Sequence, residues 1–183
     1  GPNNLSGATI GLIGWSANAK ALVRYLTPFG ARILVYSANA TSADIVAEGA
    51  KPASLAEVLA ADVVSLHRGL NAQTRKSIGQ SEIAQLKPGA VFINAARAEL
   101  VDNVALEVRL KKGDIYACLD VFEPVPLVAT SPLRKLPNVF LTSHIAGATR
   151  QMYSEASEEV AEKLVALLEG RELTDSIRSL SRL

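Results

Sequence analysis

The sequence has little that would tie it to a membrane, a nucleic acid or an oxidising environment. Its 183 residues include one cysteine, Cys118. No disulfide can form within the chain, and we expect a reducing, cytoplasmic location. Lysine and arginine total 19 and aspartate and glutamate 18, so no bulk charge favours nucleic acid or anionic lipid. No apolar run approaches the roughly 20 residues of a membrane span, and no signal peptide opens the chain.

Short apolar runs, by contrast, recur along the whole chain. Hydrophobic residues make up 49% of the sequence, which suits one domain with a sizeable core. The strand-like runs are apolar throughout rather than alternating, which is typical of parallel strands buried on both faces. The predicted strands are residues 9–13, 32–36, 63–66, 91–94, 116–121 and 139–142.

Segments with apolar residues at helical spacing lie between and after these runs. Ser54, with Glu57 three residues later, has the pattern of a capping box. Residues 122–137 hold four of the eight prolines and predict a long irregular arm. The predicted helices are residues 17–26, 42–48, 54–60, 81–86, 103–112 and 151–168.

The alternation of strands and helices predicts a Rossmann fold, a doubly wound parallel sheet in three α/β/α layers. We expect this domain to occupy residues 3–173, followed by a short polar tail at 174–183. Nothing in the spacing of histidine, cysteine and acidic residues predicts a metal site.

A Rossmann unit joins its first strand to a helix through a G-x-G-x-x-G/A turn that faces the pyrophosphate of a dinucleotide. Here the first glycine and the final, permitted alanine are present, but serine replaces the middle glycine. Serine brings a Cβ to the point where the backbone must approach the phosphates, although its hydroxyl could itself bond a phosphate. A turn that binds no ligand is therefore the alternative. The candidate cofactor residues are Gly14, Trp15, Ser16, Ala17 and Asn18.

The second element of the pattern, an acid that binds the ribose hydroxyls at the end of the second strand, is also missing. Ser37 stands there, and no acid follows until Asp44. Losing that pair of hydrogen bonds costs about 1.5–3 kcal/mol of binding free energy. No arginine follows Ser37 to meet the 2′-phosphate of NADP, and Arg68 is either a neighbour of the cofactor or a solvated surface residue. We expect NAD or NADP to bind weakly, with a slight preference for NAD.

Four sequence motifs are more specific for one protein family than the glycine turn is. They are DVVSLH (62–67), KPGAVFINAARAELVD (87–102), LDVFEP (119–124) and LPNVFLTSHIAGAT (136–149). Their order and spacing resemble the cofactor domain of the D-isomer-specific 2-hydroxyacid dehydrogenases, and the resemblance covers about residues 5–173. It implies hydride transfer between a nicotinamide cofactor and a small 2-hydroxy or 2-keto acid. It also implies a homodimer, and a catalytic (substrate) domain that this chain lacks.

The resemblance assigns two of the family's three catalytic groups to this chain. Arg97 would bind the substrate carboxylate, for which its planar fork is suited, and His144 would exchange a proton with the substrate oxygen. A surface ion pair and a structural histidine are the respective alternatives. The third group, a glutamate, falls on Val125, which cannot bind a proton. Glu123 would replace it only if the arm bends differently.

Four further positions carry over from the family motifs. Asp120 is expected near the nicotinamide amide, or as a cap on the arm. His67 is expected on the adenosine side, where it packs rather than reacts. Ala96 and Gly147 lie within the motifs around Arg97 and His144 and are expected to contact the cofactor.

Two functions are compatible with this pattern. The first is the cofactor domain of an NAD(P)-dependent 2-hydroxyacid dehydrogenase, with no turnover expected from the isolated chain. The alternative is a catalytically inactive pseudoenzyme or an assembly module. It is favoured by the departures at Ser16, Ser37 and Val125, and at Arg68-Gly69, which stands where the family usually has Leu-Pro. A Rossmann domain of another nucleotide enzyme is a third reading, which the block at 87–149 disfavours.

Overall fold

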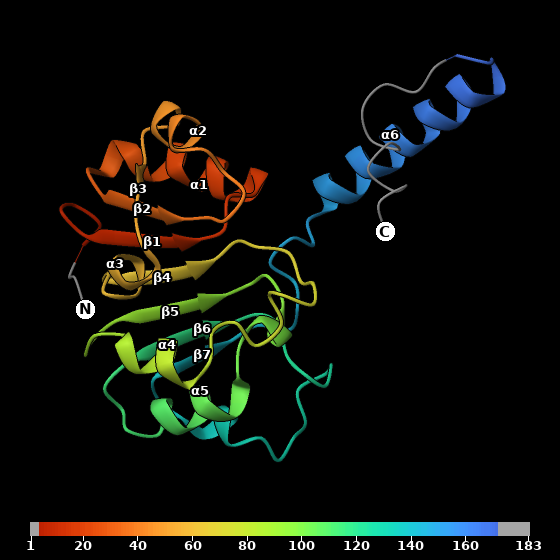
Figure 1. The fold of residues 1–183 in the computed structure, drawn as a ribbon. Coiled ribbons are helices and arrows are strands. Elements are labelled where there is room, and N and C mark those ends of the chain that lie inside the picture. Colours follow the sequence, from red (N-terminus) through yellow and green to blue (C-terminus); the bar gives the residue numbers. More distant parts are fainter. Residues whose placement is uncertain (1–3, 172–183) are drawn as a thin grey trace. The chain divides into compact units, whose positions relative to one another are not determined.

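The structure is a computed structural model that describes residues 4–171. These residues form two compact units, 4–144 and 145–171, and each is described by itself. The first unit is built on one sheet and the second on one helix (Figure 1). The expected tail at 174–183 lies outside the described residues.

The first unit contains a seven-stranded parallel sheet in the order β3-β2-β1-β4-β5-β6-β7. The chain builds outwards from β1 to β3, then returns to the other side of β1 and continues to β7. The predicted doubly wound parallel sheet is thereby confirmed. The strands are β1 (Thr9–Ile13), β2 (Arg32–Tyr36), β3 (Lys51–Pro52), β4 (Val63–Leu66), β5 (Val91–Asn94), β6 (Tyr116–Leu119) and β7 (Val139–Leu141).

Helices cover the sheet of this unit on both faces, as the three-layer prediction requires. Each predicted helix is present: α1 has the predicted bounds, and the others have one or both ends shifted by one or two residues. Three short 3₁₀ helices, η1 (Thr27–Phe29), η2 (Ala98–Leu100) and η3 (Pro132–Lys135), were not predicted. The α-helices are α1 (Ala17–Leu26), α2 (Ser42–Ala47), α3 (Leu55–Leu59), α4 (Gln80–Gln85) and α5 (Asn103–Leu110).

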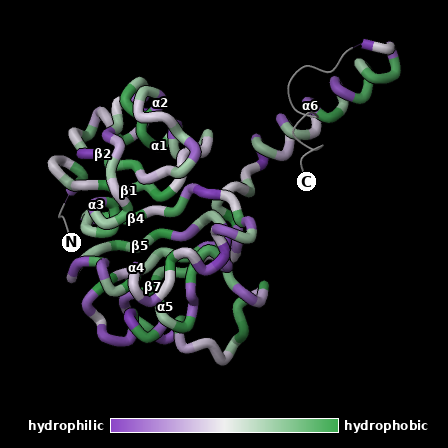
Figure 2. The backbone as a smooth tube through the Cα atoms, viewed as in Figure 1, coloured by the Kyte–Doolittle hydropathy of each residue, from purple (hydrophilic) through white to green (hydrophobic). Residues whose placement is uncertain are grey.

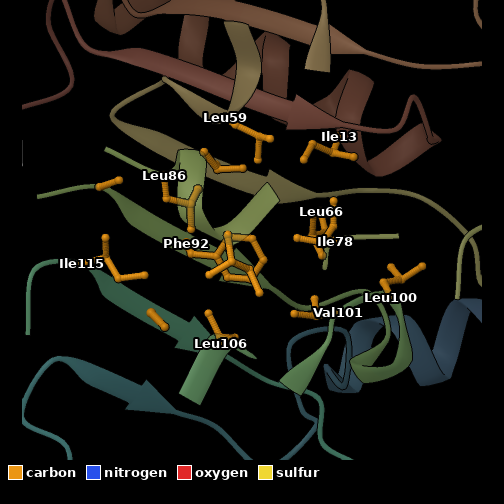
Figure 3. Close-up of a cluster of buried hydrophobic side chains, with 14 of the residues drawn as sticks. Ile13, Leu59, Leu66, Ile78, Leu86, Phe92, Leu100, Val101, Leu106 and Ile115 are labelled. Atoms are coloured by element: carbon orange, nitrogen blue, oxygen red, sulfur yellow. The ribbon is translucent and has the colours of Figure 1, made fainter. Parts of the chain in front are cut away.

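Two hydrophobic cores form, one on each face of the sheet. Ile10 and Leu12 of β1 pack with α1 and α2 on one face, and the neighbouring Ile13 belongs to the other core with α3, α4 and α5. Figure 3 shows the second core, in which Phe92 lies among Leu86 and Leu106. Figure 2 shows that β1, β4 and β5 are mostly hydrophobic, as expected for strands buried on both faces.

Local signals account for where several helices begin. The predicted capping box is present, because Ser54 Oγ accepts from the Glu57 N–H and a Glu57 carboxylate oxygen accepts from the Ser54 N–H. Asp102 caps α5 through the N–H groups of Val104 and Ala105.

The sequence analysis does not predict β3, because a strand of two residues is too short to show a hydrophobic periodicity. It pairs with the edge of β2, where Leu34 lies opposite Lys51 and Val35 opposite Pro52. Proline is tolerated there because an edge strand can leave one N–H position unused.

The second unit contains α6 (Arg150–Leu168), capped by Thr149, whose hydroxyl accepts from the Met152 N–H. Most of its apolar side chains are exposed, and Ala166 is its one buried residue. Among the described residues, no helix combines the length and the apolar character needed to cross a membrane.

Candidate functional site

A cleft of about 550 Å³ opens between the carboxyl ends of β1, β2 and β4. The strand order reverses between β1 and β4, and this switch point is where doubly wound sheets bind ligands. We call it the switch-point cleft. It is lined by three segments: the turn after β1, the turn after β2 and the loop after β4. They contribute Gly14, Trp15, Ser16 and Lys20; Tyr36, Ser37, Ala38, Asn39, Ala40 and Asp44; and His67, Arg68, Gly69, Leu70, Asn71 and Thr74.

Gly14 brings two of these segments into contact. Its φ is +105°, a conformation that side chains disfavour, and its N–H donates to the Tyr36 carbonyl at 2.8 Å. A Cβ at this position would lie 2.4 Å from the His67 carbonyl oxygen and 2.7 Å from Arg68 Cβ. Glycine is therefore required for the close packing of the β1 turn on the β4 loop.

Ser16 forms the N-cap of α1, which explains why glycine is dispensable here. Its φ of −86° is accessible to any residue, and its Oγ accepts from the Ala19 N–H at 3.3 Å. The N–H groups of Ala17 and Asn18 have no acceptor among the described residues. Two first-turn donors thus remain for an anion at the positive end of α1.

Ser37 closes the turn after β2 without any carboxylate. Its Oγ accepts from the N–H groups of Asn39 at 3.3 Å and Ala40 at 3.2 Å. Asp44, the nearest acid downstream, lines the same cleft, and its carboxylate accepts from the Thr41 hydroxyl at 2.8 Å.

Two aromatic groups, Trp15 and His67, line the cleft. Trp15 is half-buried, and Lys20 Nζ lies 5.8 Å from the centroid of its ring, a cation–π contact. His67 is also half-buried; its ring Nε2 is 2.9 Å from Ser65 Oγ, and burial lowers its pKa. The neutral form of the imidazole is therefore favoured at pH 7.

Arg97 lies beyond β5 on a loop that a buried asparagine holds in place. Asn94 Nδ2 donates to the Arg97 carbonyl at 2.9 Å, and Asn94 Oδ1 accepts from the Ala96 N–H at 3.0 Å. The Arg97 side chain is exposed, and its Nη1 donates to the Ala96 carbonyl. Sequence reasoning missed Asn94; its signal is a lone polar residue that ends an otherwise apolar strand.

Asp120 is buried at the end of β6 and connects three strands. Its N–H donates to the Asn94 carbonyl at 3.0 Å, and its Oδ1 accepts from the Thr142 hydroxyl at 2.5 Å. Thr142 follows β7 and precedes His144 by two residues. Asp120 therefore positions the segment that carries the histidine.

His144 and Val125 line the same small cavity, of about 170 Å³. Phe122, Pro126 and Leu127 of the arm complete most of its apolar wall. Glu123 is exposed and does not line it. The arm thus places valine, rather than Glu123, beside the histidine.

The predicted cofactor residues divide into three groups by position. Gly14, Trp15, Ser16, Ser37 and His67 line the switch-point cleft, and Ala17 and Asn18 begin the helix beside it. Ala96 and Asp120 lie at the ends of β5 and β6, further along the same sheet edge. Gly147 belongs to the second unit. No group of three or more metal-ligating side chains occurs within residues 4–171.

Comparisons with known proteins agree with this geometry. Residues 2–146 match the family described as D-isomer specific 2-hydroxyacid dehydrogenase, NAD binding domain. The chain belongs to this family. A glyoxylate reductase of Korarchaeum cryptofilum is 38% identical over 167 residues, which are 90% of this chain and 50% of the relative. A D-3-phosphoglycerate dehydrogenase of Mycobacterium leprae is 32% identical over 173 residues, which are 93% of this chain and 33% of the relative.

Solved structures of this family share the fold. The crystal structure of D-lactate dehydrogenase with NAD⁺ from Lactobacillus jensenii matches with a TM-score of 0.82 at 31% identity. That match covers 91% of this chain and 54% of the dehydrogenase chain. The chain thus spans about half the length of the first relatives that it matches, and the NAD-binding domain is the half that it resembles.

Proposed function

We propose that the switch-point cleft binds a nicotinamide dinucleotide, NAD or NADP. We further propose that the chain is the cofactor-binding part of an oxidoreductase. The observation that carries the proposal is the position of the cleft at the point where the strand order reverses. Its volume of about 550 Å³ is also in the range of small-molecule and cofactor sites.

The residues at the turn after β1 suit the pyrophosphate of such a ligand. Gly14, which has no Cβ, lets the turn after β1 pack closely on the β4 loop, and both segments line the cleft. The N–H groups of Ala17 and Asn18 are left for phosphate oxygens, and Lys20 adds a positive charge to the same wall. Because Ser16 adopts an ordinary backbone conformation, its presence instead of glycine costs no backbone strain.

In a longer protein, the reaction that we infer is hydride transfer with a small 2-hydroxy or 2-keto acid. When bound, the nicotinamide supplies or accepts the hydride. Arg97 binds the substrate carboxylate, and His144 exchanges a proton with the substrate oxygen. These residues follow β5 and β7 at one sheet edge, and the ends of these two strands lie two strand spacings, roughly 10 Å, apart. A small acid fits between side chains of their length.

Val125 supports a second candidate function, cofactor binding without turnover. It occupies the cavity wall beside His144, where the family motif has the acid that would stabilise the protonated imidazole. In another enzyme class, weakening the acid partner of a catalytic histidine lowers the rate by about 10⁴. A pseudoenzyme or an assembly module would retain the cleft and tolerate this valine.

Fluorescence of Trp15, the sole tryptophan, tests the binding proposal, since its side chain lines the cleft. We expect NADH or NADPH to quench it saturably, with a dissociation constant between roughly 1 µM and 1 mM, the usual range of Michaelis constants. Free tryptophan, titrated in parallel, corrects for absorption by the cofactor. No saturable change up to several millimolar, together with no heat in calorimetry, would refute cofactor binding.

Oxidation of the bound cofactor distinguishes the two functions only in a protein that also carries a substrate domain, because neither function predicts turnover by the chain alone. With glyoxylate or pyruvate as the probe acid, the dehydrogenase predicts turnover by that protein, and cofactor binding without turnover predicts none above the uncatalysed background. Val125→Glu in that protein is expected to raise the rate. Steady turnover by its unaltered form would contradict the second candidate and favour the first.

The homodimer and the cytoplasmic location stay predictions of the sequence. Light scattering at micromolar concentration tests the first, and a monomeric mass would contradict it. The location rests on the use of a single cysteine, Cys118, whose half-buried thiol has a pKa raised by burial.

A further inference from the structure

The turn after β2 is the place where a dinucleotide site distinguishes NAD from NADP. An acid there binds the ribose diol of NAD, and basic groups nearby accommodate the 2′-phosphate of NADP. Here the position belongs to Ser37, whose Oγ accepts two backbone N–H groups and keeps its own hydrogen free to donate among the described contacts. The turn therefore supplies no carboxylate that would repel a phosphate.

Arg68 lines the wall of the cleft formed by the β4 loop. A Cβ built on Gly14 would lie 2.7 Å from the Cβ of Arg68, so the backbone of Gly14 and the side chain of Arg68 are close neighbours. The residue is half-buried, and within the described part of the chain its guanidinium has no hydrogen-bond acceptor and no carboxylate partner. A guanidinium without an acceptor in a cleft wall is suited to a phosphate, which it can bind through two parallel hydrogen bonds.

The charge of the cleft wall also favours an anion. Arg68 and Lys20 contribute two cations, while Asp44 is the single acid among the described lining residues. The Asp44 carboxylate accepts from the Thr41 hydroxyl at the start of α2, and its side chain is exposed to solvent. A phosphate carrying about two negative charges is attracted more strongly by this wall than an uncharged diol.

We propose that the switch-point cleft selects NADP(H) over NAD(H), with Arg68 and Ser37 binding the 2′-phosphate. This inference rests on the proposed function, because it concerns the same cleft. It reverses the slight preference for NAD expected from the sequence. That expectation rested on the absence of an arginine next to Ser37 in the chain, whereas Arg68 reaches the cleft from the loop after β4.

The test is a pair of titrations, NADPH and NADH, read by Trp15 fluorescence and by calorimetry on the unaltered chain and on Arg68→Gln. We expect NADPH to bind more tightly than NADH. Arg68→Gln should weaken the binding of NADPH by roughly 10- to 150-fold, because charge-assisted hydrogen bonds are lost. It should weaken the binding of NADH by less than threefold. Raising the salt concentration should weaken NADPH more than NADH, because the added contact is between charges.

Two further variants make the result specific. Arg75→Gln removes an exposed arginine from the same stretch of chain that does not line the cleft, and it should change neither affinity. Ser37→Asp places a carboxylate at the end of β2, and it should weaken NADPH and strengthen NADH. Adenosine 2′-monophosphate should compete with NADPH more effectively than adenosine 5′-monophosphate.

The outcomes separate this inference from the function on which it rests. Equal or tighter binding of NADH overturns the NADP preference while leaving cofactor binding intact. If Arg68→Gln weakens both dinucleotides alike, Arg68 contacts a part that they share, and the 2′-phosphate assignment is wrong. If neither dinucleotide binds, both the inference and the proposed function fail.

Discussion

Replacing Gly14 by alanine tests the packing that creates the switch-point cleft. An alanine at φ +105° costs about 1–2 kcal/mol of backbone strain. Its Cβ would also lie 2.4 Å from the His67 carbonyl oxygen and 2.5 Å from the carbonyl carbon, both backbone atoms that cannot rotate away. Overpacking of this kind adds about 1–3 kcal/mol.

The two costs together predict a loss of about 2–5 kcal/mol in the free energy of unfolding. In a chain of this size, each 1 kcal/mol corresponds to a change in Tm of about 2–4 °C. We therefore expect Gly14→Ala to lower the Tm by roughly 4–20 °C. Since the β4 loop must move, the affinity for the dinucleotide should fall as well. Thermal unfolding by circular dichroism and the Trp15 titration measure the two effects.

Two other glycines serve as matched controls. Gly113 has φ +74° and no atom within 4 Å of its hypothetical Cβ, so Gly113→Ala should show the strain alone, roughly 2–8 °C. Gly69 lines the cleft with neither clash nor positive φ, so Gly69→Ala should not lower the Tm. If Gly14→Ala were no more destabilising than Gly113→Ala and bound cofactor normally, the close approach of the two segments would be disproved.

Three further changes test the local contacts. Ser16→Ala should lower stability by about 1 kcal/mol through loss of the α1 cap, whereas Ser16→Gly should cost only a few tenths; equal losses in thermal unfolding would contradict the capping role. The Lys87 ammonium, 2.7 Å from the Asp62 carboxylate, and the Thr9 N–H hold the pKa of Asp62 below its ordinary 3.8. Asp62→Asn should therefore cost about 0.5–1 kcal/mol at pH 7. The difference between the variant and the unaltered chain should shrink as the pH falls below 3.8 and through the lower pKa of the folded state; a difference that stayed constant below pH 3.8 would contradict this. Asn138 donates to the Leu110 and Ile115 carbonyls, and the Leu110 carbonyl also accepts from the Gly113 N–H. Asn138→Ala should therefore cost about 1–3 kcal/mol, mainly by leaving the Ile115 carbonyl without its donor; a drop in Tm of less than about 2 °C would refute it.

The departures from the family motif have different consequences once their surroundings are known. Ser16 keeps an ordinary backbone conformation and caps a helix, so it leaves the cleft usable. Val125 places an apolar side chain beside His144, so it bears on proton transfer. The departure at Ser16 therefore concerns cofactor binding, and the departure at Val125 concerns proton transfer.

The class of fold and the main elements could be predicted from the amino-acid pattern alone. Fully apolar runs such as β4 predict buried parallel strands, and Ser54 with Glu57 predicts the start of α3, because these signals depend on near neighbours in the chain. The motifs around Arg97 and His144 placed both residues after strands, and hence at one edge of the sheet.

Which of these residues line the same site, by contrast, depends on the packing of distant segments. Arg68 reaches the cleft that Ser37 lines from a different strand, and Val125 lies beside His144 although 19 positions separate them. The strand β3 exists only because β2 offers it an edge. Such contacts depend on strand order and on the path of the arm, which arise from packing over long distances, and no local pattern of residues encodes them.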